Sequence, residues 1–528
     1  MPAYVLRDIA VSIYDRRELR EVIAEKAGFD AADITNVEIR RRSLDLRKKA
    51  VDIYYVYTVV FYTKRAVNQK HIPKYTEEKK PVIFPRVNTG QRPVIVGAGP
   101  AGLFCAYTFL KYGIMPIVLE RGQRIARRIE DVAAFEKDRV FAADSNICFG
   151  EGGAGTFSDG KLTSRSKDNV RQQFIFDTLV KFGAESSICY DSRPHLGTDG
   201  MRRAVENMTD EMMRLGAEFR FATKLEAIDI KDGRLRAAVC KEAEIPAAVI
   251  VLACGHSARD TYEMLKRSGC AMQAKPFAVG LRIEHRREDI DRMSYGGHYG
   301  KAALPAAEYI MRYQDPSGRG AYTFCNCPGG VVVPCVTEEG TLCVNGMSYA
   351  GRDEVNTNSA VVVGVGGADF DLEDPMAGIA YQRRMENRAY LLGGSSYKAP
   401  VMPVGAFLNT TDLKGFGEVV PSNTCGVQEA DIGSCFDKEI TMVLQRALRA
   451  FGHRMNGFDS ANAMLTAVES RTSSAIRILR NAQNESINVG GLYVAGEGSG
   501  YAGGIISSAI DGMKTAEKIC EKLKNARE

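Results

Sequence analysis

The chain has 528 residues, 45% of them hydrophobic, and a formal net charge of +5, so it exceeds one ordinary domain and has the apolar content of a globular protein with two or three cores. Its longest weakly polar run spans about 17 residues, 94–110, and its first residues lack a basic and then apolar signal segment, so we expect neither a membrane span nor a secretory signal. Its thirteen cysteines, an odd number without framework spacing, argue against a disulfide scaffold and for a reducing compartment, and we expect a cytoplasmic protein.

The N-terminal region, residues 1–90, carries the whole positive excess, with 18 Lys and Arg against 12 Asp and Glu. The excess peaks at residues 40–49, which hold six positive side chains and one negative. Hydrophobic patterning predicts a strand, a helix and two further strands, at residues 4–13, 17–27, 36–43 and 51–63. We therefore predict a small basic α+β domain that ends in a proline-containing linker, residues 68–92. The basic segment is expected to be a solvated hairpin face, and the alternative is a site for RNA or another acidic macromolecule.

A glycine motif follows the linker. An apolar strand at residues 94–96 leads into Gly97-x-Gly99-x-x-Gly102, then into a helix and a second apolar strand. Gly97 permits a tight turn, Gly99 lets a pyrophosphate approach the backbone, and Gly102 lets the helix pack closely on the strand. Phosphate charge would then meet the unpaired N–H groups at the helix N-terminus. In this strand, turn, helix and strand order, the motif predicts a bound dinucleotide.

The second strand ends in Glu120, twenty-three residues after Gly97. A carboxylate at this position is placed to accept hydrogen bonds from an adenosine ribose. It would repel the 2′-phosphate of NADP, which leaves NAD or FAD.

The middle of the chain alternates between glycine-rich, helical and strand patterns. Residues 149–161 include seven small or flexible residues among thirteen, which suits a loop lying against a phosphate-linked cofactor, although an Ω-like structural loop is the alternative. A helix at 198–215 and a strand pair turning at 231–233 are then predicted, with the paired strands at 218–230 and 234–239. From 276 to 457 the pattern is β-rich and irregular, and it predicts a substrate domain inserted between two halves of the cofactor domain. Its clearest strands are expected near 278–284, 310–313 and 330–336.

The C-terminal part distinguishes the two remaining dinucleotides. Residues 490–500 form a buried strand that breaks into a glycine-rich turn before a helix, and this arrangement resembles the second flavin motif of FAD-dependent oxidoreductases. In those proteins the strand ends in Gly-Asp and the acid binds the ribityl chain, whereas here the acid is Glu497. Residues 249–255 resemble the strand that carries their Ala-Thr-Gly motif, with Cys254 where Thr is usual.

The three motifs occur in that family's order, about 160 and 240 residues apart. From about residue 92 the chain therefore resembles the FAD-dependent oxidoreductase superfamily with one dinucleotide fold. Within it, the sequence is similar to the bacterial FAD-dependent dehydrogenases related to geranylgeranyl-reductase-like flavoproteins. The segments that suggest this are residues 149–162, 193–199, 324–330 and 469–473.

The resemblance implies an α/β fold with a Rossmann-type FAD-binding domain, an inserted β-rich substrate domain and the small N-terminal α+β domain. We expect the FAD-binding domain at 91–275 and 460–528, and the inserted domain at 276–459. The residues that the motifs and the resemblance assign to the cofactor are Gly97, Ala98, Gly99, Pro100, Ala101, Gly102, Glu120, Arg121, Gly152, Gly153, Gly155, Thr156, Lys161, Leu225, Cys254, Gly255, Gly496, Glu497, Gly503, Gly504 and Ile505. The last three open the final helix, whose positive end could face the flavin O2.

Catalysis is expected to rest on the flavin, with hydride passing to or from N5 and a side chain moving a proton. The candidates for that proton or for binding an anionic substrate are His195, His256, Arg193, Tyr322 and Arg471. No second nucleotide motif is found, so NAD(P)H is expected only as a transient electron donor, with a quinone or a ferredoxin as alternatives. The spacing of Cys325, Cys327, Cys335 and Cys343 matches no common zinc site, and we predict no metal.

Three functional hypotheses remain open. The first is a dehydrogenase or reductase that acts on a small molecule by hydride transfer. The second is a flavin-dependent monooxygenase, which shares the single-domain plan. The third is a flavoprotein whose N-terminal domain binds RNA or another macromolecule. Specificity depends on side chains whose arrangement spacing does not reveal, so the substrate itself is not predicted.

Overall fold

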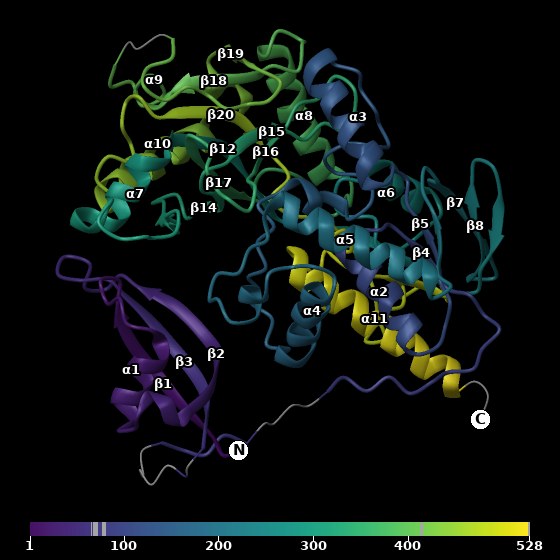
Figure 1. The fold of residues 1–528 in the computed structure, drawn as a ribbon. Coiled ribbons are helices and arrows are strands. Elements are labelled where there is room, and N and C mark those ends of the chain that lie inside the picture. The colour runs from purple at the N-terminus through teal and green to yellow at the C-terminus, as the bar shows by residue number, and fades with distance from the viewer. Residues whose placement is uncertain (65, 67–71, 77–80, 412–414, 526–528) are drawn as a thin grey trace.

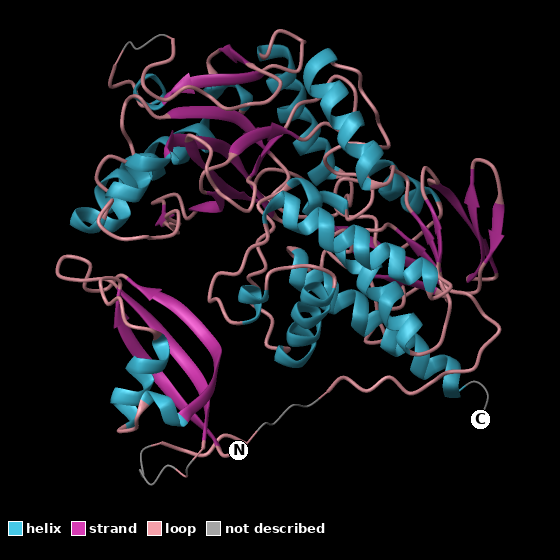
Figure 2. Cartoon of the chain, in the orientation of Figure 1, coloured by secondary structure: helices cyan, strands magenta, loops and turns pink. Residues whose placement is uncertain are grey.

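The computed structural model describes residues 1–64, 66, 72–76, 81–411 and 415–525 (Figures 1 and 2). The chain has a mixed α/β fold, whose main sheets are an N-terminal sheet, a central parallel sheet and a large, mostly antiparallel sheet. No described helix is long and apolar enough to cross a membrane.

The N-terminal sheet has the order β1-β3-β2 and is antiparallel throughout. Its elements are β1 (Ala3–Ser12), α1 (Leu19–Ala27), β2 (Ile34–Asp45) and β3 (Tyr54–Thr63). One face of the sheet is covered by α1, where Ile23 joins Val59 and Phe61 in a separate small core. The helix begins two residues later than predicted, because the Glu21 carboxylate accepts the Glu18 N–H at 3.1 Å and caps the helix there.

A five-stranded parallel sheet with the order β22-β10-β4-β5-β6 lies at the centre of the main body. Its strands are β4 (Val94–Val96), β5 (Ile117–Leu119), β6 (Glu218–Arg220), β10 (Ile250–Leu252) and β22 (Leu492–Val494). Neighbouring residues of a strand belong to different cores, Ile95 to one and Val94 and Val96 to the other. Because both faces are buried, the central strands are unbroken aliphatic runs.

Helices and a small sheet cover the two faces. One face carries α2 (Pro100–Lys111), α4 (Asn169–Lys181), α5 (Gly197–Arg214) and α11 (Ile505–Asn525). The other carries α3 (Ile125–Asp138), α6 (Arg259–Arg267) and a three-stranded sheet of β7 (Leu225–Lys231), β8 (Arg234–Cys240) and β9 (Glu244–Pro246). Helices α2 and α11 lie side by side (Figure 1), and a Cβ added to Gly512 would lie 2.0 Å from the Ala101 carbonyl oxygen.

The prediction of one strand at 218–230 was wrong in one respect, because these residues form two strands that belong to two different sheets. The chain turns between β6 and β7, where Ala222 has φ of 50° and its N–H donates to the Gly122 carbonyl at 2.9 Å. The first part therefore pairs with β5, and only the second part pairs with β8 in the predicted hairpin.

The large sheet has the order β13-β14-β17-β12-β20-β18-β19. Its strands are β12 (Phe277–Arg286), β13 (Arg312–Gln314), β14 (Gly320–Cys327), β17 (Asn356–Val365), β18 (Ala399–Pro403), β19 (Val427–Glu429) and β20 (Met464–Glu469). The longest pairing joins β12 to β17 from Phe277 with Val365 to Arg286 with Asn356. Since β20 belongs to this sheet, the sheet extends beyond residue 459, where the sequence predicted the insert to end.

Residues 276–459 also include helices that the sequence did not predict. They are α7 (Arg287–Tyr295), α8 (Ala377–Leu392), α9 (Val404–Phe407) and α10 (Lys438–Arg454). The remaining strands form two ribbons, β15 (Val331–Pro334) with β16 (Val344–Met347) and β11 (Met272–Ala274) with β21 (Ile476–Ile478).

The predicted linker, 68–92, lies partly outside the described residues. In its described part, the Pro73 carbonyl accepts the Val5 N–H at 3.1 Å, so the segment extends the edge of β1. Residues 81–92 form no helix or strand.

Candidate functional site

A cavity of about 1560 Å³ lies between the parallel sheet and the large sheet. Single small-molecule sites usually measure about 300–1,000 Å³, so this cavity has room for a large cofactor and a second molecule. Its walls include the carboxyl ends of β4, β5 and β10, the starts of α2 and α11, and parts of β12, β14 and β16. In the sheet, β4 has β5 on one side and β10 on the other, and open α/β sheets bind ligands at such a change of direction.

The turn between β4 and α2 leaves its backbone open to the cavity. Gly97 has φ of 105°, and a Cβ there would lie 2.4 Å from the Ala253 carbonyl oxygen. A Cβ on Gly102 would lie 1.8 Å from the Gly97 carbonyl oxygen, so this glycine is needed for the close contact of helix and strand. Gly99 is different, because its added Cβ would meet only Gly153 Cα, at 3.8 Å, and would project where a ligand approaches.

Glu120 accepts hydrogen bonds from backbone groups of three segments around this turn. Its side chain is 5% exposed, and its carboxylate accepts the N–H groups of Ala98 at 2.7 Å, Gly122 at 3.0 Å and Gly150 at 2.9 Å. A carboxylate has about four acceptor positions, so one remains for a ligand hydroxyl. The carboxylate lines the cavity, and the ribose contact stays a prediction.

The glycine-rich loop packs on the β4–α2 turn. The Gly152 N–H donates to the Ala98 carbonyl at 2.9 Å. Gly153 and Gly155 line the cavity, whereas Gly152 and Thr156 face away from it into the protein. The reason is Arg128, a fully buried side chain of α3 that the sequence analysis missed. Its guanidinium donates to Thr156 Oγ1 at 2.7 Å, and to the carbonyl oxygens of the loop at Asn146, Ile147, Glu151 and Gly153.

Three further predicted cofactor residues are held on the parallel-sheet side of the cavity. Leu225, Cys254 and Gly255 line it at the start of β7 and just after β10. Arg121 lines it as well, and its guanidinium is paired with Asp144 at 2.5 Å and Asp260 at 2.8 Å. Arg121 is therefore already neutralised by the protein.

The C-terminal motif supplies another part of the wall. Gly496, Glu497, Gly503, Gly504 and Ile505 line the cavity where β22 ends and α11 begins. Asp511, one turn and a half into α11, accepts the Gly496 N–H at 2.8 Å and pairs with Arg480 at 2.8 Å. It also lines the cavity and was not predicted, because nothing in the local sequence distinguishes it from a surface acid.

Two of the predicted cofactor residues, Ala98 and Gly102, lie behind this surface and shape the turn without lining the cavity.

Lys161 lines the cavity. Its ammonium pairs with Asp159 at 2.8 Å and donates to the Asn326 carbonyl oxygen. Burial alone would lower the pKa of Lys161, but the Cys327 thiol and Asp159 outweigh it and raise that pKa, so Lys161 is protonated.

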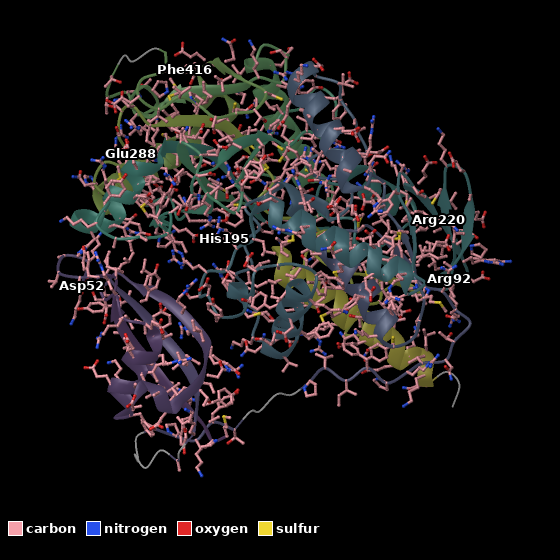
Figure 3. All side chains as sticks on the ribbon, viewed as in Figure 1. Asp52, Arg92, His195, Arg220, Glu288 and Phe416 are labelled. Atoms are coloured by element: carbon pink, nitrogen blue, oxygen red, sulfur yellow. The ribbon has the colours of Figure 1, made fainter. Side chains whose placement is uncertain are left out.

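The predicted catalytic residues separate into two groups. His256, Arg193, Tyr322 and Arg471 line the cavity, and His195, labelled in Figure 3 near the centre of the view, does not. The backbone of His195 pairs with that of Lys161, and burial, helped by Arg352, lowers the pKa of its ring. His195 therefore lies outside the cavity lining, and its catalytic role stays a prediction.

Arg471 is anchored in a buried ion-pair cluster. It donates to Glu386 at 2.8 Å, and Arg259 donates to the same carboxylate at 2.7 Å. Burial alone would raise the pKa of Glu386, but the two guanidinium groups outweigh it and hold that pKa well below its usual range. The charge of Arg471 is thus compensated within the protein.

The remaining candidates are more open. Arg193 keeps 55% of its side chain exposed and lies 3.6 Å from Glu308, and burial raises the pKa of Tyr322 on β14. Among the described residues, no group of three or more His, Cys, Asp or Glu side chains could hold a metal ion.

Comparisons with known proteins give the following matches. Residues 276–472 match a family model described as "FAD-dependent protein, C-terminal domain-like", and residues 6–62 match a domain of unknown function, DUF8436. An uncharacterized protein of Clostridium beijerinckii is 45% identical over 519 residues, which cover 96% of this chain and 97% of that protein. Among solved structures, the tetracycline destructase Tet(51) is 10% identical with a TM-score of 0.35, over 83% of this chain and 82% of that one. The flavin-dependent brominase Bmp2 is 12% identical with a TM-score of 0.36, over 83% and 79%.

Proposed function

We propose that this chain, which belongs to the same protein family as its clostridial relative, is an FAD-dependent oxidoreductase that transfers hydride through flavin N5 to or from a small molecule. The observation that carries the proposal is the continuity of the cavity. It runs from the glycine turn of β4 and α2 to residues of the segment that matches the FAD-dependent model, between 276 and 472.

The residues present fit a dinucleotide. At Gly97 and Gly102 any added Cβ would meet backbone atoms, and at Gly99 and Gly153 the chain leaves a cradle without side chains. In our proposal the start of α2 holds the pyrophosphate, because its N–H groups and helix dipole favour an anion. Glu120 would hold the adenosine ribose, and the start of α11 at Gly503 and Gly504 would face the pyrimidine edge of the flavin.

When bound, FAD supplies a two-electron centre that accepts or donates hydride. The chain's own residues orient the substrate and move the accompanying proton. We assign the proton to His256, because it lines the cavity directly after the β10 turn at Gly255. We assign substrate orientation to Tyr322 and Arg193, because neither side chain is engaged in a buried ion pair such as the one between Arg471 and Glu386.

The proposal is tested first with the purified protein. We expect flavin absorption bands that bleach under anaerobic addition of NADH or NADPH. Bands that resist both nucleotides would leave FAD binding intact and direct the search to a quinone, a ferredoxin or the substrate as the redox partner. NADPH use that depends on oxygen and an aromatic substrate would replace hydride transfer with the monooxygenase alternative. A colourless protein that cannot be reconstituted with FAD would overturn the proposal.

A matched pair of variants tests where the cofactor lies. Gly99→Ala adds a methyl group with ordinary contacts to the protein, and Gly90→Ala adds one with no neighbour within 4 Å. We expect Gly99→Ala to weaken FAD binding about tenfold or more, because the methyl group separates the pyrophosphate from the backbone. Gly90→Ala should bind FAD as the wild type does, and both apoproteins should keep the wild-type melting temperature. Unchanged FAD affinity in Gly99→Ala would contradict the assigned position.

A further inference from the structure

Two thiols from distant parts of the chain meet at the cavity wall. Cys148 directly precedes the glycine-rich loop, and Cys335 follows β15 in the insert. Both line the cavity, and their thiols lie close enough to affect each other's ionisation. Cys343 also lines the cavity, and its thiol donates to the Cys335 carbonyl oxygen at 2.9 Å, which fixes the backbone beneath the pair.

We propose that Cys148 and Cys335 form a redox-active dithiol that reacts with low-molecular-weight disulfides entering the cavity. This activity stands apart from the proposed flavin chemistry, because it needs only the two thiols and the cavity that exposes them.

The surroundings of the pair favour a thiolate. The Cys335 thiol, the positive charge of Arg471, the His256 ring and Ser257 lie near Cys148. Together, with the Cys335 thiol contributing most, they outweigh burial and lower the pKa of Cys148 to about 6. Thiolates are the reacting form of cysteine, and a nearby cation with a hydrogen-bond donor is the environment that produces them.

Three other cysteines, Cys105, Cys254 and Cys425, show the opposite behaviour. Burial raises the pKa of Cys254 and Cys425 to about 12 and that of Cys105 well above its usual range. Cys189 is partly exposed, as Cys148 is, yet it lies outside the cavity, and burial followed by the charge of Asp177 raises its pKa. Two neighbouring thiols, a cation and an open cavity therefore distinguish Cys148 and Cys335 from these four cysteines.

The exposure of the two thiols indicates which of them attacks the small disulfide first. Cys148 is partly exposed, whereas Cys335, which also lines the cavity, is only 6% exposed. In the first step the Cys148 thiolate attacks one sulfur of the small disulfide RSSR, which forms a mixed disulfide with Cys148 and releases RS⁻. Cys335 then loses its proton and attacks the Cys148 sulfur, which releases the second RS⁻. The two protein thiols lose two electrons and two protons, and RSSR becomes two RSH.

The test uses the protein as purified, with bis(hydroxyethyl) disulfide as the probe. After exposure, the remaining thiols are alkylated and tryptic peptides are analysed by mass spectrometry. We expect a linked Cys148–Cys335 peptide in the wild type and, in Cys335→Ser, a hydroxyethylthio adduct on Cys148. Reduction with dithiothreitol should remove both products. In Cys189→Ser, the matched control from outside the cavity, the linked peptide should form as in the wild type.

A second measurement needs no variant. In the wild type at neutral pH, iodoacetamide should alkylate Cys148 about fivefold faster than Cys189, because the gain in thiolate fraction exceeds the loss of intrinsic nucleophilicity that accompanies a lower pKa. The proposal is overturned if Cys148 and Cys335 are recovered as free thiols after exposure of the wild type to the disulfide. Equal alkylation rates of Cys148 and Cys189 would overturn it as well. Neither result would bear on FAD binding.

Discussion

The two walls of the cavity differ in the chemical groups that form their surfaces: backbone groups on one side and charged side chains on the other. On the side of β4 and α2, backbone groups form the surface, and Gly97 and Gly99 keep side chains out of the way. On the other side, formed by residues between 276 and 472, the surface is held by charged side chains whose partners are buried, as Arg471 is held by Glu386. The first wall is therefore sensitive to added atoms, and the second is sensitive to a removed charge.

The largest effect is expected from removing the shared anion of the second wall. Glu386 is 0% exposed and accepts hydrogen bonds from Arg259, Arg471 and Ser470. Glu386→Gln should lower the free energy of unfolding by about 3–5 kcal/mol, because two guanidinium groups lose their common counter-charge in a buried place. The measurement is thermal unfolding followed by circular dichroism. The control is Glu439→Gln. Glu439 pairs with Arg319, but 54% of the Glu439 side chain is exposed, so this variant should change the free energy of unfolding by less than about 1 kcal/mol. Equal losses in the two variants would show that burial does not distinguish these pairs.

A smaller loss is expected when one methyl group is added to the first wall. In Gly102→Ala the new Cβ would lie 1.8 Å from the Gly97 carbonyl oxygen, so α2 must shift away from β4. We expect a loss of about 1–3 kcal/mol in stability, as for overpacked cores, together with loss of FAD binding. Gly297→Ala places its methyl group with no atom within 4 Å and should change neither property. Retained FAD binding in Gly102→Ala would mean that the turn is not rigid.

The second wall also carries a pH-dependent contribution. Glu469 is 3% exposed, and burial raises its pKa to about 6, although Arg282 at 2.8 Å opposes the shift. A carboxyl group with a raised pKa binds its proton more tightly in the folded protein than in the unfolded one, so its contribution to stability falls as pH rises from about 4.5 to about 6. The total change is on the order of 2 kcal/mol.

Comparison with Glu469→Gln isolates this group. The stability of the wild type relative to Glu469→Gln should be greater at the acid end of that window than at neutral pH. Urea unfolding at both pH values measures the difference. A wild-type advantage that instead grows toward neutral pH would mean that the ion pair with Arg282 dominates burial and that the carboxyl pKa is lowered.

The contrast between the walls also explains what the sequence could predict. The glycine motif, the strand that ends at Glu120 and the C-terminal turn are local patterns, and 17 of the 21 predicted cofactor residues line the cavity in the structure. The four that do not, Ala98, Gly102, Gly152 and Thr156, lie one layer behind it. Spacing indicates that a loop reaches the cavity but not which of its residues face inward.

The second wall was not predictable in the same way. Arg471 and Glu386 are 85 residues apart and Cys148 and Cys335 are 187 apart, so only the folded chain brings them together. Helices α8 and α10 were missed because the sequence pattern of residues 276–457 was interpreted as β-rich throughout. Arg128 gave no signal either, since it occurs among other charged residues of an amphipathic helix and is identified only by its burial.

The smallest expected effect concerns the N-terminal domain, which contacts one edge of the cavity, residues 190–193, from outside. The backbone of Arg42 on β2 pairs with residues 190–192, and its guanidinium donates to both carboxylate oxygens of Asp191, at 2.6 and 2.8 Å. The next residues, Ser192 and Arg193, line the cavity, so the domain fixes one edge of it.

Arg42→Ala should cost no more than about 1 kcal/mol, because both partners are partly exposed, but it should loosen this edge. We expect amide hydrogen exchange of residues 190–193 to rise about fivefold, the factor that corresponds to such a loss, while exchange in β12 stays unchanged. Arg41→Ala, an exposed neighbour on the same strand, is the matched control and should leave residues 190–193 as they are. The same pair tests the alternative role of the basic segment. If RNA retention at low salt falls equally in both variants, the positive face binds a macromolecule, whereas a change confined to Arg42→Ala in exchange alone assigns that residue to holding the cavity edge.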